Sequence, residues 1–255
     1  MRAGRRFPSE SLPGKTTEEG RHEAWRVGGI DRMSLEQSLD ERGHAKLPRL
    51  LDAPTCRQFE ALYDQPDRYR KRVVMAEQGY GRGEYRYFAY PLPPLVARLR
   101  WDLYALLAPI ANRWNVALGQ NISYPATMAA FLARCHAAGQ TLPTPLMLEY
   151  RAGDFNHLHQ DLYGEHAFPL QVVILLSRWQ LDFTGGEFAM VERAEGKQRI
   201  EVVTMEQGDA IVFAGNQRPS INGQGGTDIV VASHGVSRVH RGRRLTLGVI
   251  FHDAL

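Results

Sequence analysis

Seven short apolar segments in the C-terminal part of the chain constrain the fold more than any other feature. From Pro145 onward they read LMLEY, LQVVILL, GEFAMVE, RIEVVTM, DAIVFA, DIVVAS and RLTLGVIF, and glycine-containing turns, including one at Gly242, separate them. Runs of this length, rich in β-branched residues and bounded by glycine, predict strands. Because no helical pattern lies between them, a parallel sheet is disfavoured. We therefore expect an antiparallel double-stranded β-helix, or jelly roll.

Helical patterns occupy the preceding part of the chain. Ser34 followed by Gln37 predicts the capped start of one helix, and Asp52 predicts the start of another. Leucines, followed by Ile110 and Trp114, recur every three or four residues over 95–114 and predict a longer helix with one apolar side. We expect these helices to pack on the outside of the sheet, in a mainly β protein with flanking α-helices.

The composition divides the 255 residues into three parts. Residues 1–30 are rich in Gly, Ser, Pro, Arg and Glu, and predict a flexible N-terminal tail. Residues 31–144 predict a helical and hairpin extension, and residues 145–255 the double-stranded β-helix core.

Charge and apolar content limit the classes of function. The net charge of +3 is too small for a dedicated nucleic-acid binder, yet permits an anionic ligand. Cys56 and Cys135 lack the paired spacing of a zinc or redox site, which predicts buried thiols. With no secretory signal and no apolar run long enough to cross a bilayer, we expect a cytoplasmic protein without a membrane partner.

One cluster of histidines and acids has the spacing of a metal site. His157, His159 and Asp161 alternate, so an extended strand would place them on one face. His234 ends a later predicted strand, and Arg244 opens the next. Two imidazoles and one carboxylate form the facial triad that suits iron(II), with three coordination positions left open. A structural zinc site would instead be closed by four ligands.

The order of these motifs resembles a known superfamily. The HxD of His159 and Asp161, then a long gap, then HGVxxVxxGxR from His234 to Arg244, is similar to the 2-oxoglutarate and iron(II)-dependent dioxygenases, especially their prolyl-hydroxylase-like branch. The resemblance implies that His159, Asp161 and His234 bind iron(II). It also implies that Arg244 pairs with the far carboxylate of 2-oxoglutarate, that Tyr150 lines this pocket, and that no catalytic residue is needed beyond the metal ligands. Dioxygen would then drive decarboxylation to succinate, coupled to hydroxylation of a substrate carbon.

The substrate stays open between three hypotheses. YRAGDFNHLHQDLYGEHAFPLQ and GVIFHDA resemble a bacterial subgroup, which implies oxidative demethylation of damaged nucleic-acid bases. Nucleic-acid dealkylases of the AlkB kind carry a second arginine six residues after the first, where this chain has Ile250. The alternatives are a prolyl-hydroxylase-like oxygenase that acts on a protein side chain or small molecule, and a non-enzymatic metal-binding β-barrel.

Basic and aromatic residues interleave over 68–90. Such a segment could follow phosphates and stack on bases. We favour a hairpin whose aromatic rings pack on the barrel while its charges face water. A nucleic-acid substrate would require Arg68, Arg70 and Lys71 to line a groove that leads to the metal. The glycine-flanked GYGRGEYRY within the segment is a candidate substrate lid.

Overall fold

The computed structural model describes residues 27–161, 164–221, 223 and 225–255. The predicted flexible tail lies outside this part of the chain except for residues 27–30, where a short 3-10 helix, η1 (Val27–Gly29), forms.

The helices lie in the N-terminal part, as the sequence predicts. They are α1 (Arg32–Arg42), α2 (Ala53–Tyr63), α3 (Pro94–Ala117) and α4 (Met128–Ala137), with 3-10 helices η2 (Pro66–Arg68) and η3 (Met75–Gln78). The strands of the N-terminal part are β1 (His44–Leu47), β2 (Tyr69–Val74), β3 (Gly81–Arg82) and β4 (Glu84–Phe88). Those that follow are β5 (Leu146–Arg151), β6 (Phe155–His159), β7 (Leu170–Leu175), β8 (Phe183–Gly185), β9 (Phe188–Ala194), β10 (Lys197–Val203), β11 (Ala210–Ala214), β12 (Gln217–Ile221), β13 (Thr227–Val236) and β14 (Val239–Val249).

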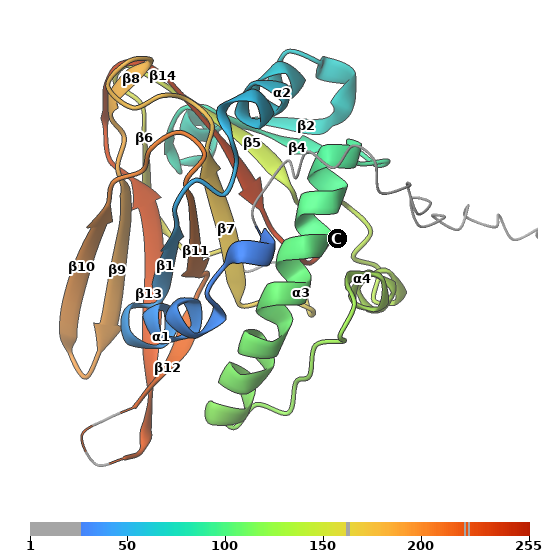
Figure 1. Ribbon diagram of the computed structural model, residues 1–255, viewed down its shortest axis with the longest axis vertical. Coiled ribbons are helices and arrows are strands. Elements are labelled where there is room, and N and C mark those ends of the chain that lie inside the picture. The colour runs from blue at the N-terminus through green and yellow to red at the C-terminus, as the bar shows by residue number, and fades with distance from the viewer. Residues whose placement is uncertain (1–26, 162–163, 222, 224) are drawn as a thin grey trace, which may run out of the picture.

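Two antiparallel sheets form the centre of the molecule (Figure 1). The larger sheet has the order β1-β11-β7-β14-β5-β4-β2, with β8 paired to β14. The smaller sheet has the order β10-β9-β13-β6-β3, with β12 paired to β13. From β5 to β6 and on to β7 the chain passes to the smaller sheet and back, and β13 and β14 again lie in different sheets. This confirms the predicted jelly roll with flanking helices.

The predicted extension of residues 31–144 contributes strands to both sheets. β1 pairs with β11, and β4 and β2 continue the larger sheet beyond β5. β3 crosses over and pairs with β6 of the smaller sheet. Strands of the N-terminal part therefore pair directly with strands of the predicted core. The division into domains at residue 144 stays a prediction.

Helix α3 stands against the larger sheet (Figure 1). Its apolar side carries Leu99, Leu103 and Leu107, and all three belong to the same buried core as Leu247 and Val249 of β14. Each leucine buried in this way contributes about 1.5–3 kcal/mol. Packing of these apolar stripes therefore fixes the helix on the outer face of the sheet and leaves the inner face for the site.

Two local predictions were wrong. Helix α1 begins after Asp31, whose side chain accepts a hydrogen bond from the Met33 amide, so Ser34 is in the first turn and is not the cap. Gly242 was expected to separate two strands, but β14 runs through it. It has a φ of 82°, and a Cβ there would lie 1.9 Å from the Asp182 carbonyl oxygen. Glycine therefore permits the irregular pairing with β8 without ending the strand.

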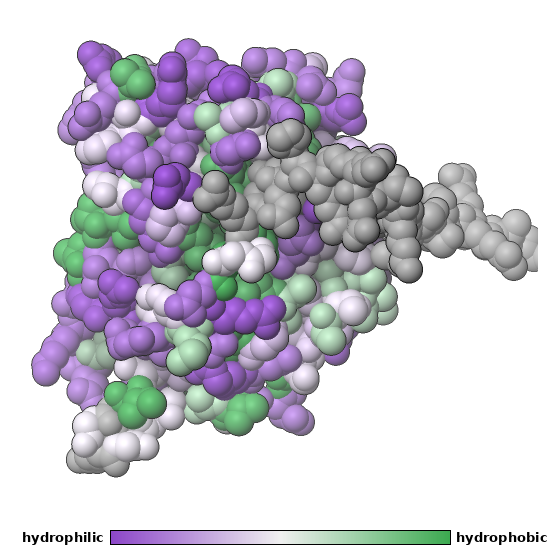
Figure 2. All heavy atoms as spheres, viewed as in Figure 1, coloured by the Kyte–Doolittle hydropathy of each residue, from purple (hydrophilic) through white to green (hydrophobic). Residues whose placement is uncertain are grey.

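The surface is mostly hydrophilic on the face that carries the helices, with an apolar group at the edge where β9 and β10 lie (Figure 2). Both cysteines are unpaired and buried, as predicted, and burial raises the pKa of Cys56 to about 12. Among the described residues, no helix is both long and apolar enough to cross a membrane.

Candidate active site

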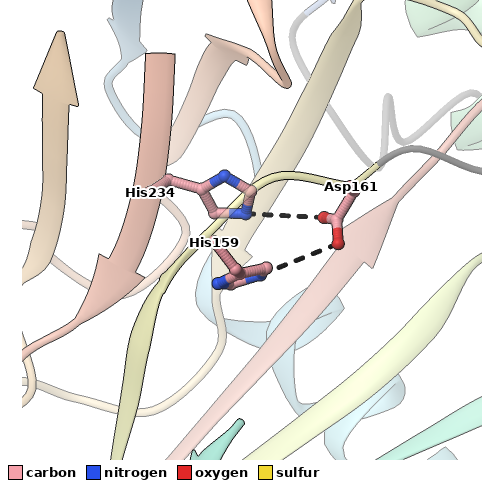
Figure 3. Close-up of side chains that lie close together, drawn as sticks. All are labelled: His159, Asp161 and His234. Carbon is pink, nitrogen blue, oxygen red and sulfur yellow. Dashed lines mark ion pairs between the residues drawn. The ribbon is translucent and has the colours of Figure 1, made fainter. Parts of the chain in front are cut away.

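The structure brings His159, Asp161 and His234 together (Figure 3). His159 ends β6, and His234 lies directly opposite it on β13 as its register partner. Asp161 follows two residues after His159 and faces both rings. Its carboxylate oxygens lie 3.7 Å from His159 Nε2 and 3.5 Å from His234 Nε2, and one ligand atom from each residue lies within 4.8 Å of the others. Three donors at these separations suit a single cation between them.

A hydrogen bond to the backbone fixes the orientation of the His159 ring. Its Nδ1 lies 2.8 Å from the carbonyl oxygen of His157, and since a carbonyl only accepts, Nδ1 must donate. In the neutral ring this leaves the lone pair on Nε2, which faces Asp161. Burial lowers the pKa of His159, and the neighbouring His234 lowers it further. The neutral, metal-binding form is therefore favoured.

His234 is held by aromatic packing. Its ring stacks on Phe188 at 6.1 Å between centroids, and Phe213 lies at 4.6 Å. Its centroid is 4.3 Å from that of His159. The two imidazoles thus lie side by side at one wall of a cavity of about 310 Å³ between the sheets.

Arg244 lies on the wall of the same cavity, on β14, opposite Tyr150 of β5. Its side chain is 2% exposed, and Nε and Nη1 have no hydrogen-bond partner among the described residues. The guanidinium carbon lies 5.6 Å from the Tyr150 ring centroid, and the Tyr150 hydroxyl also has no partner within the described chain. A buried cation without an anion is costly, so these groups are arranged for an anionic ligand.

Burial sets the ionisation of both groups. It lowers the pKa of Arg244 to about 10 and raises the pKa of Tyr150 to about 12. At neutral pH Arg244 is therefore still a cation and Tyr150 still a hydrogen-bond donor. Arg243 points to the other face, where it pairs with Glu149, as strand alternation predicts.

The other polar residues near the triad in sequence do not join it. His157 is exposed, and within the described chain it is not one of the residues grouped for a metal. His240 is exposed as well, whereas His252 is fully buried and its Nδ1 accepts a hydrogen bond from the Phe168 amide. Asn156 lines the cavity, and Arg151 pairs with Glu149 at the surface.

Sequence reasoning missed two polar residues of the cavity. Thr246 Oγ1 and Gln171 Nε2 are buried and have no hydrogen-bond partner among the described residues. Thr246 is two residues after Arg244 on the same strand, so the two-residue period could have identified it. Gln171 is the single polar residue in LQVVILL, which was also a signal.

The segment 68–90 forms the expected hairpin of β2 and β4, with Arg86 over the Tyr63 ring at 4.0 Å. Arg70 and Lys71 line a groove of about 340 Å³ that shares Tyr80, Tyr85 and Tyr87 with the cavity. Arg68 does not line this groove and bonds Gln65 instead.

Comparison with known proteins identifies the class. The profile of a family described as "oxygenase, catalysing oxidative methylation of damaged DNA" matches residues 83–254. Two proteins of Mycobacterium tuberculosis, from strains CDC 1551 and H37Rv and both called uncharacterized, are each 44% identical over 191 residues, which is 72% of this chain and 82% of theirs. The chain therefore belongs to this oxygenase family.

Solved structures share the fold. A prolyl-4-hydroxylase of Pseudomonas putida aligns with a TM-score of 0.53 and 17% identity, over 88% of this chain and 100% of that one. An oxidoreductase of the 2OG-Fe(II) oxygenase family from Burkholderia pseudomallei aligns with a TM-score of 0.51 and 18% identity, over 90% and 95%. The family match confirms that the chain is an oxygenase, and these structures confirm the fold expected from the sequence.

Proposed function

We propose that this protein oxidises alkylated bases in nucleic acid, with iron(II) held by His159, Asp161 and His234 and 2-oxoglutarate anchored by Arg244. The observation that carries the proposal is the convergence on a single cavity of three metal-type donors and one buried guanidinium, two of whose nitrogens have no partner among the described residues. A merely structural ion would give Arg244 no reason to be buried there.

The donor set fits iron(II). His159, Asp161 and His234 would hold iron(II) through two imidazoles and one carboxylate, the donor set that this ion accepts with positions left open for ligands. The separations of 3.5 and 3.7 Å between Asp161 and the imidazole nitrogens exceed hydrogen-bond lengths, which is consistent with donors arranged around a cation. Bound iron would supply the activation of dioxygen that the organic groups of the protein cannot provide.

The residues of the chain have three tasks in this proposal. Arg244 and Tyr150 bind and orient the far carboxylate of 2-oxoglutarate by charge-assisted hydrogen bonds, with Thr246 beside them. His159 and His234 are kept in place by the His157 carbonyl and by Phe188 and Phe213. The apolar walls, among them Leu146, Leu148 and Val172, limit the access of water to the reaction.

The family match supports the nucleic-acid substrate, since its description names damaged DNA. An N-methyl group on a base is a carbon whose hydroxylation gives an unstable hemiaminal, and this releases formaldehyde and the repaired base. The cavity is enclosed between two sheets, so a base would have to leave its stack to enter.

The test is an assay of purified protein with iron(II), 2-oxoglutarate and single-stranded oligonucleotides that carry one methylated base. We expect succinate and formaldehyde in equal amounts with the methylated strand, and little succinate with the unmodified strand. His159→Ala should abolish both products. Formation of succinate that proline-containing peptides stimulate, and methylated strands do not, would favour the prolyl-hydroxylase-like alternative and contradict the proposal.

A further inference from the structure

A basic and aromatic groove adjoins the active-site cavity and has no role in the chemistry described above. It is lined by residues of β2, by the tyrosines at positions 80, 85 and 87, and by the C-terminal residues Ala254 and Leu255. We propose that this groove binds single-stranded nucleic acid next to the base that enters the cavity. The inference rests on the proposed function and adds to it the surface that selects the substrate.

Strand register puts the groove and the cavity on one continuous sheet face. Lys71 pairs with Tyr87, Tyr87 pairs with Leu146, and Leu146 pairs with Gly248 of β14. Residues opposite one another in neighbouring strands point to the same side of a sheet. This row therefore leads from Lys71 at the edge of the larger sheet to the wall of the cavity, and Tyr87 borders both.

The cations of the groove are available for an anion. Arg70 lies 4.6 Å over the Tyr87 ring and donates to the Pro143 carbonyl, and Lys71 is exposed. Within the described chain, neither forms an ion pair with a carboxylate. Arg72 also borders the groove, but it is paired with Glu84, whose carboxylate lies on the opposite face of the strand. Glu77 is the acidic residue that the groove contains.

Tyr80 marks the boundary between the groove and the cavity. Tyr80 is 49% exposed, and its carbonyl oxygen accepts a hydrogen bond of 2.9 Å from the amide of His157 on β6, the strand that carries His159. Strand β3, which begins directly after Tyr80, pairs with β6, and this pairing fixes the backbone of Tyr80 beside the cavity. An exposed, anchored ring at the entrance is suited to stack on a base, and stacking accepts any base because each has a π-face.

These features favour single-stranded nucleic acid over a duplex or an acidic peptide. Two cations beside three tyrosines provide phosphate contacts together with stacking surfaces, the combination found in proteins that bind unpaired strands. A duplex hides its base faces, so it could use the cations but not the rings. An acidic peptide could likewise use only the cations.

The test measures binding of a fluorescein-labelled oligothymidylate of about 12 nucleotides to the full chain loaded with manganese(II), which prevents turnover. Lys71→Glu should weaken binding by about tenfold, and Lys71→Ala should lower the slope of log K against log salt by about 0.7. The matched control is Lys197→Glu, the same charge change on exposed β10 at the far end of the smaller sheet, which should alter affinity by less than about twofold. Equal losses in Lys71→Glu and Lys197→Glu would overturn the proposal.

Two variants of Tyr80 test whether its ring stacks on a base. Tyr80→Ala should weaken binding at least about fivefold, whereas Tyr80→Phe, which keeps the ring, should bind as the wild type does. Both variants should unfold at the wild-type temperature. Equal affinity for a hairpin duplex, or equal displacement by an oligoglutamate peptide, would contradict a single-strand site. The probe carries no methyl group, so this experiment measures strand binding independently of oxidation. Loss of strand binding would not change the result of the oxidation assay, and a negative oxidation assay would not change the measured affinity for the strand.

Discussion

At the scale of single residues, Arg243 and Arg244 show how strand alternation gives neighbours different roles. Arg243 is partly exposed and paired with Glu149, whereas Arg244 is buried with two unpartnered nitrogens among the described residues. Binding of 2-oxoglutarate, as we propose, would offset the cost of burying the second guanidinium. Alternation of side chains along β14 explains this difference, since neighbours on a strand point to opposite faces.

Replacement of Arg244 tests that interpretation. In the presence of manganese(II), N-oxalylglycine at 100 times its dissociation constant should stabilise the wild type by about 2.7 kcal/mol, or roughly 5–10 °C in unfolding temperature. Arg244→Met should lose this shift, and without ligand it should be at least as stable as the wild type, because an unpaired buried charge is removed. Arg243→Met should retain the shift. A normal ligand-induced shift in Arg244→Met would contradict the assignment.

His252 supplies a prediction about pH. Burial, followed by the charge of Arg100, lowers the pKa of this fully buried ring to about 4. Between pH 6.5 and 4 the unfolded chain therefore binds a proton that the folded chain does not, so stability should fall by roughly 3 kcal/mol as the pH decreases through this range. His252→Asn, whose amide oxygen can still accept from the Phe168 amide, should show a shallower decrease in urea unfolding. An unchanged pH profile would contradict this account.

At the scale of elements, the sequence predicted the apolar strands of the C-terminal part and missed the short strands β8 and β12 between them. β5, β7, β9, β10, β11, β13 and β14 coincide with the seven predicted segments. β6 was seen only through its alternating histidines, since FNHLH has no buried apolar run. α4 was missed although Met128, Phe131 and Cys135 follow a helical period, because only three residues of this short helix are buried.

The crossover strand β3 offers a test at this scale. Gly81 has a φ of 130°, and a Cβ there would lie 2.4 Å from the Phe155 carbonyl oxygen of β6. Gly81→Ala should therefore break the β3–β6 pairing, lower the free energy of unfolding by more than about 2 kcal/mol, and weaken metal binding through His159. Gly79→Ala, with a φ of 72° and open space around its Cβ, should cost about 1 kcal/mol. Urea denaturation compares the free energies of unfolding of the two variants. Gly81→Ala combines a backbone clash with an unfavourable φ, whereas Gly79→Ala has the unfavourable φ alone.

At the scale of the whole molecule, the site exists because two sheets bring distant segments together. The HxD motif and the distal histidine meet through the pairing of β6 with β13, and Arg244 reaches the same cavity from the other sheet. The sequence identified these residues by motif order, and it named Arg70 and Lys71 for a groove, but it did not predict how that groove meets the cavity beside Tyr80. That groove depends on the register of β2, β4 and β5, which the alternation of residues does not determine.

The most direct test of the account is equilibrium binding of manganese(II), as a replacement for iron(II), followed by electron paramagnetic resonance. The wild type should bind one ion per chain. His159→Ala and Asp161→Ala should each weaken binding by more than about 100-fold, because each removes a ligand and not merely a group behind one. His157→Ala, which keeps the carbonyl behind His159, should bind as the wild type does. Unchanged affinity in Asp161→Ala, or loss of binding in His157→Ala alone, would contradict the triad.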